Sequence, residues 1–164
     1  MSKKKVAMTD SLQLRGYLEF VLRDARNNQI VAKGSGHNTV TAGGRGWALA
    51  RLTPASNAQV MSAIAIGSIS SSAPSSNQTA LGGYLTIKNF GTTGLTSSTG
   101  AACTFTGAIS FNTNETFTGS SQIGEFCIYN SADSGGTMFN RVTTSTYINF
   151  STSNTLAVTM TITN

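Results

Sequence analysis

The sequence predicts an all-β fold: an antiparallel β-sandwich, with jelly-roll or immunoglobulin-like strand order, and one short helix near residues 43–53. Apolar and polar residues alternate along most of the chain, which is the pattern of half-buried strands. These runs recur about every ten residues between turns rich in Gly, Ser and Asn. Only 10% of the 164 residues are charged. This composition, rich in Ser and Thr, disfavours a helical bundle.

The length favours one domain. We expect a single β-sandwich domain over residues 11–164, preceded by a flexible basic N-terminal arm over residues 1–10 that contains Lys3, Lys4 and Lys5. No apolar run approaches the roughly 20 residues that a bilayer-spanning helix requires. Polar residues interrupt the first segment before a signal-peptide core can form. We therefore expect no membrane partner and synthesis in a cytoplasm.

A β-hairpin is expected to open the fold. Residues 12–23 alternate almost perfectly, residues 24–28 are turn formers, and residues 29–33 resume the alternation as an antiparallel partner. His37 follows in a Gly-flanked turn. There we expect a hydrogen-bonded or solvated imidazole rather than a catalytic one.

One segment changes from a two-residue to a helical period. Trp47 and Leu52 share one side of the predicted helix, Thr41 is its expected N-cap, and Pro54 follows its end. The glycines at 43–46 lack the Gly-Lys-Ser/Thr ending of a phosphate-binding loop. We interpret them as a flexible start of the helix and not as a nucleotide site.

The rest of the chain supplies the other predicted strands. They lie at residues 61–67, 84–90, 103–111, 123–130, 137–142, 147–150 and 155–163. The expected core consists of Leu14, Leu18, Phe20, Leu22, Trp47, Ile64, Ile66, Phe105, Ile109, Phe111, Phe126, Ile128, Leu156, Val158 and Ile162. The opposite strand faces are rich in Thr and carry few charges that would discourage pairing with another chain. This predicts a homo-oligomer or a larger assembly.

Positive charge is concentrated in the first third of the chain. The net charge is +5, and nine of the 11 Lys and Arg residues precede position 52. Most of them alternate with apolar residues, as on the solvated face of a strand. We interpret them as a solubilising face plus an arm that docks on a neighbour, in preference to a specific nucleic-acid site.

Residues that usually carry catalysis are scarce. The chain has one His, two Cys and six scattered carboxylates, and it lacks a Gly-x-Ser-x-Gly elbow and metal-ligand spacings. We therefore expect no enzyme activity and no catalytic, cofactor-binding or metal-binding residues. Glu125, inside an apolar run, is interpreted as a structural carboxylate that accepts hydrogen bonds or pairs with a cation. Cys103 and Cys127 are interpreted as buried thiols, with a disulfide as the alternative.

Three segments, in order, resemble those of small virion proteins of tailed bacteriophages. The first is HNTVTAGGRGWALARL at residues 37–52, similar to an N-x-V-T-x-x-G motif followed by a short helix. The second is IAIG at 64–67 with AP at 73–74 and QTAL at 78–81, similar to I-A-x-G-x-G, A-P and T-x-L. The third is IGEFCIYN at 123–130 with GGTMFNRV at 135–142, similar to I-x-E-x-G-L-F and G-x-x-M-x-x-R. The chain departs from these patterns at two places: Gly67-Ser68-Ile69 stands where the motif has Gly-x-Gly, and Cys127 occupies a place that is often Gly.

This resemblance implies a non-enzymatic virion structural protein, present in multiple copies as a capsid decoration or a tail or fibre accessory component. Its implied partners are other copies of itself and other virion proteins. For assembly we expect two elements to act: the arm with Lys3, Lys4 and Lys5, and the polar loop at 68–79, represented by Ser70, Pro74 and Asn77.

The alternative function is a carbohydrate-binding module that recognises a bacterial surface glycan. Tyr84, Tyr129 and Tyr147 are the candidate residues for stacking on sugar rings. A glycan hydrolase is disfavoured, because no pair of carboxylates at a suitable spacing is identifiable.

Overall fold

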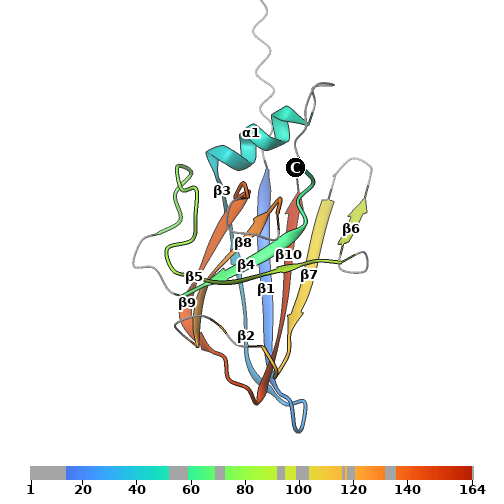
Figure 1. Cartoon of the computed structure of the whole chain (residues 1–164), viewed down its shortest axis with the longest axis vertical. Helices are drawn as coiled ribbons and strands as arrows, with labels where there is room; N and C mark the ends of the chain where they lie inside the picture. The colour runs from blue at the N-terminus through green and yellow to red at the C-terminus, as the bar shows by residue number, and fades with distance from the viewer. Residues whose placement is uncertain are drawn as a thin grey trace, which may run out of the picture.

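The structure, a computed structural model, describes residues 14–51, 59–68, 73–91, 95–98, 104–115, 117, 121–131 and 136–163. Within these ranges the chain forms ten strands and one helix, α1 (Ala42–Ala50), which lies at one end of the strands (Figure 1). The strands are β1 (Arg15–Asp24), β2 (Ile30–His37), β3 (Thr39–Val40), β4 (Ala63–Gly67), β5 (Tyr84–Asn89), β6 (Leu95–Ser98), β7 (Thr104–Phe111), β8 (Gln122–Tyr129), β9 (Asn140–Asn149) and β10 (Asn154–Thr163).

The strands form two antiparallel sheets, which confirms the predicted all-β sandwich with one short helix. The first sheet has the order β2-β1-β10-β7-β6 and the second has the order β3-β9-β8-β4-β5. β1 and β10 pair along their full length, from Arg15 opposite Thr163 to Asp24 opposite Asn154. In an immunoglobulin fold the first and last strands lie in different sheets, so this pairing departs from that order.

The predicted hairpin is present as β1 and β2, joined by a tight turn. Asn28 has a φ of 58°, a left-handed conformation that Asn tolerates better than most residues. The Arg26 side chain donates to the Asp24 carboxylate and lowers the pKa of that carboxyl to about 2. β2 extends to His37, so this histidine ends a strand and does not sit in the predicted turn. Its exposed ring lies 5.5 Å from that of Tyr17.

The core between the sheets agrees closely with the predicted one. Twelve of the fifteen expected residues are buried in it. The other three, Leu14, Trp47 and Phe105, are partly buried and pack against it. The alternation of apolar side chains therefore identified the inner faces of β1, β4, β7, β8 and β10 correctly.

The ninth strand differs from the prediction of two separate strands at 137–142 and 147–150. β9 is continuous, but its register against β8 shifts between Ile123 and Glu125. Ile123 pairs with Ile148 and Glu125 pairs with Thr143, so residues 144–147 face Gly124 alone. This is a large β-bulge with four residues opposite one, and its polar sequence produced the apparent gap in the pattern. The short strands β3 and β6 were not predicted.

Helix α1 has the predicted cap. The Thr41 side chain accepts a hydrogen bond from the Gly44 N–H at 3.0 Å, and its hydroxyl donates to the Met138 carbonyl at 2.6 Å. The Trp47 ring meets Phe139 edge-on at 5.8 Å. A Cβ built on Gly44 would lie 2.1 Å from the Phe139 carbonyl oxygen. Gly44 therefore permits the close approach of the helix to the second sheet.

Two glycines of this helix test that contact. We expect Gly44→Ala to lower the free energy of unfolding by about 1–3 kcal/mol, because the new methyl group overlaps backbone atoms. Gly46 has no atom within 4 Å of its built Cβ, so Gly46→Ala is the matched control. It should leave stability unchanged or raise it by up to about 1 kcal/mol. Urea unfolding curves measure both, and equal effects of the two substitutions would contradict the packing argument.

Candidate functional site

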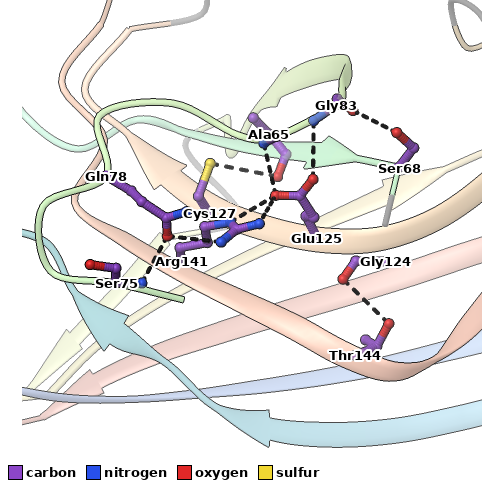
Figure 2. Close-up of polar contacts among 11 residues, drawn as sticks. Ala65, Ser68, Ser75, Gln78, Gly83, Gly124, Glu125, Cys127, Arg141 and Thr144 are labelled. Carbon is purple, nitrogen blue, oxygen red and sulfur yellow. Dashed lines mark hydrogen bonds and ion pairs between the residues drawn. The ribbon is translucent and has the colours of Figure 1, made fainter. Parts of the chain in front are cut away.

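Strand β8 is buried on both of its faces. Phe126 and Ile128 point into the core between the sheets. On the other side, Cys127 and Tyr129 belong to a second apolar cluster that also contains Leu81, from the segment 73–83. That segment covers the outer side of the second sheet, where Figure 2 shows the polar contacts that hold it.

A buried ion pair lies under this segment. Glu125 of β8 and Arg141 of β9 both have side chains with no exposed surface. Arg141 Nε and Nη2 lie 2.7 Å and 2.6 Å from Glu125 Oε2. This is the cation partner that we expected for Glu125. Sequence reasoning missed Arg141, although it is the one cation in the last 70 or so residues and follows a Gly- and Met-containing motif.

The same two side chains bind the covering segment. The backbone N–H groups of Gly82 and Gly83 donate to the Glu125 carboxylate at 3.0 Å and 3.1 Å. Arg141 Nη1 donates to Gln78 Oε1 at 2.8 Å, as Figure 2 shows. Burying two charges costs several kcal/mol unless the remaining donors and acceptors are satisfied. Here the carboxylate accepts three hydrogen bonds, and its Oε2 also forms the ion pair with Arg141 Nη2. The network therefore fixes the segment on the sheet.

The thiol and the phenol beside this network are shielded from solvent. Cys127 is a free thiol with no exposed surface, and burial raises its pKa. Cys103 lies outside the described residues. Burial also raises the pKa of Tyr129, which is only 3% exposed.

The predicted sugar-stacking tyrosines do not form a site. Tyr129 is buried under the segment 73–83, so the prediction that it stacks on a sugar ring is wrong. Tyr84 and Tyr147 are exposed, but they belong to β5 and β9, with β4 and β8 between them. A strand spacing of about 4.8 Å separates them by more than 14 Å across the sheet.

The predicted assembly residues are described only in part. Lys3, Lys4, Lys5 and Ser70 lie outside the described residues. Pro74 is half-buried and Asn77 is exposed, both in the segment that Gln78 attaches to Arg141. The Ala42 N–H also donates to the Ser76 carbonyl, so this part of the loop is fixed to the start of α1.

The first sheet presents a different surface. Side chains that alternate with the core residues point outward from β2, β1, β10 and β7, and the ladders align them in three rows of four. None of the twelve is buried. We call this set the open face, and it consists of Lys33, Ser35, His37, Tyr17, Glu19, Val21, Ala157, Thr159, Thr161, Thr106, Ala108 and Ser110.

Two shallow hollows cross the open face. One has a volume of about 440 Å³ and is lined by residues that include Tyr17, Glu19 and Lys33. The other has a volume of about 320 Å³ and reaches Lys88 at the end of β5, where the ammonium group is paired with Glu115. Both hollows share Ala157 and Thr159. They exist because small side chains occupy the centre of β10 and β7.

Among the described residues, no group of three or more His, Cys, Asp and Glu side chains is placed to hold a metal ion. No helix in the same part of the chain has the length and apolar character needed to cross a bilayer.

Comparisons with protein-family models, with curated proteins and with solved structures find no match for the chain. The structure itself offers two regions on which a function can rest. One is a closed polar network that holds a segment in place, and the other is an accessible face with hollows.

The buried pair gives a stability prediction. Arg141→Met leaves the Glu125 carboxylate buried without its cation, and we expect it to lower the free energy of unfolding by about 3–5 kcal/mol. The double variant Glu125→Gln, Arg141→Met removes both charges and keeps an acceptor for the glycine N–H groups. It should recover most of the loss in urea unfolding. If the single and double variants lose the same free energy of unfolding, the loss comes from packing and not from the uncompensated charge.

Proposed function

We propose that the chain is a non-enzymatic structural protein that assembles in multiple copies on a bacteriophage particle. It acts there as a capsid decoration or as a tail or fibre accessory component, with other copies of itself and other virion proteins as partners. The open face is the observation that carries the assembly part of this proposal. It is regular and hollowed, and its charged residues are one acid and one base, Glu19 and Lys33, whose charges cancel.

The resemblance of three segments to phage virion proteins carries the other part. Contacts between these segments support treating them as one unit. Thr41 of the first segment donates to the Met138 carbonyl of the third, and Arg141 of the third donates to Gln78 of the second. Motifs that lie far apart in the sequence therefore meet on the outer side of the second sheet.

The alternative, a carbohydrate-binding module for a bacterial surface glycan, is favoured by one observation on the open face. The rings of Tyr17 and His37 lie side by side at 5.5 Å next to the hollow that Glu19 and Ser35 line. An exposed ring beside a carboxylate and a hydroxyl is suited to a sugar, which offers an apolar ring face and polar edges.

Localisation tests the structural proposal directly. Immunogold electron microscopy of purified particles, with an antibody to this chain, should place label over the head for a capsid decoration. Label at the tail or fibre tips would indicate an accessory component. No label on intact or disrupted particles would overturn the virion assignment.

The same particles test the N-terminal arm. We expect a chain that lacks residues 1–9 to be incorporated less than the full chain, because the arm with its three lysines is proposed to dock on a neighbour. Quantitative immunoblots of purified particles measure incorporation. Unchanged incorporation would show that the arm has no assembly role.

A glycan array tests the alternative. If the chain binds saccharides, Tyr17→Ala should abolish the signal, while Tyr147→Ala, at an exposed ring of the other sheet, should leave it unchanged. Equal signals from both variants would remove Tyr17 from the site, and no signal from the unaltered chain would remove the carbohydrate-binding function.

A further inference from the structure

We propose that the open face is a contact between two copies of this chain, which pack together with these faces opposed. The inference rests on the proposed function, because it names the surface through which copies of a structural protein meet. Three features of the open face support it, namely accessibility, shape and charge, and the size of the face sets the strength of the contact.

The two sheets differ in what covers their outer sides. The second sheet is covered by the segment 73–83, so that β8 is buried on both faces. On the first sheet, Glu19, Lys33, Ser35 and Ala157 are all exposed to solvent. Within the described part of the chain, the open face is therefore the accessible sheet surface that another sheet can cover.

Its shape is suited to sheet-on-sheet packing. β10 pairs in unbroken register with β1 and with β7, so the centre of the face has no bulge. Opposed sheets pack about 10 Å apart with interdigitating side chains. Ala157 and its neighbours form the hollows, while Tyr17 is 37% exposed beside them. Hollows and protruding rings on one surface make it self-complementary, as a two-fold contact requires.

Charge identifies a second copy as the partner. The chain carries a net charge of +5, so two copies repel each other at most orientations. The open face holds one acid, Glu19, and one base, Lys33, on neighbouring strands. Arg15 and Arg23 lie on the same side of β1, in the two rows that flank the open face. Within its three rows the charges of Glu19 and Lys33 cancel, so a contact confined to these rows brings two like-charged molecules together where the net charge is zero.

The size of the face sets the strength of the contact. Four strands about 4.8 Å apart and three rows about 6.8 Å apart give a flat patch of roughly 400 Å² on each copy. A standard interface buries about 800 Å² on each partner, so a single contact of this kind is weak. Many copies held on one particle would strengthen it through effective concentration.

Sedimentation equilibrium of the full chain up to about 1 mM tests the contact. We expect a reversible monomer–dimer equilibrium. Ala157→Lys and Ser110→Lys each place an extra charge on the open face, and each should raise the dimer Kd at least about tenfold. Thr146→Lys, on the exposed bulge of β9, is the matched control and should leave the Kd unchanged. Far-UV circular dichroism and urea unfolding confirm that each variant is folded, and the two open-face variants provide independent readings.

A chain that stays monomeric throughout this range overturns the inference, as does an equal effect of Ala157→Lys and Thr146→Lys. Binding of a saccharide through Tyr17 by a monomeric chain would assign the hollow to a glycan instead. The test is separate from that of the proposed function. If the antibody labels particles although the chain is monomeric in solution, the virion role stands and the contact does not. If the chain self-associates but the particles carry no label, the contact stands and the virion role does not.

Discussion

The ion pair between Glu125 and Arg141 is the interaction on which the arrangement of the molecule depends. Two charges without exposed surface are stable only if each is fully compensated. The compensation comes from β8, from β9 and from the segment 73–83, through Gln78, Gly82 and Gly83. The pair therefore requires the segment to lie on the sheet, and the segment in turn buries the second apolar cluster around Cys127.

This constraint makes the sandwich asymmetric. On the second sheet the segment 73–83 adds a third layer, and the capped helix α1 is fixed beside it through Thr41 and the Ala42 N–H. The first sheet has the usual two-layer arrangement, with one face in the core and one face in solvent. Polar groups on the closed side are used to hold the fold, so the accessible chemistry of the described residues is concentrated on the open face.

Sequence patterns predicted the features that depend on local periodicity, namely strand faces and the helix cap. They did not predict the contacts that form between segments far apart in the sequence. Alternation identified the inner faces of β1, β7 and β10, and the Thr41 cap was recognisable from its position before the helical period. The buried position of Tyr129 was missed, although Phe126-Cys127-Ile128-Tyr129 is a continuous apolar run of the kind found in strands that are buried on both faces. Which segment covers the second face is decided by residues far away in the sequence. Arg141 was missed as the partner of Glu125, because 16 residues and a strand register that only folding defines separate them.

The distribution of charge is consistent with a molecule that is dispersed when free and covered when assembled. A neutral, hollowed β surface is an association hazard for an isolated domain. Here the positive charge concentrated in the first third of the chain gives free copies a net repulsion, which weakens with ionic strength. The open face is nearly neutral, so pairing through it adds little to this repulsion and gains from burial of Tyr17 and Val21. Under the proposed function, a weak contact becomes effective only where many copies are already held close together, which would restrict assembly to the particle.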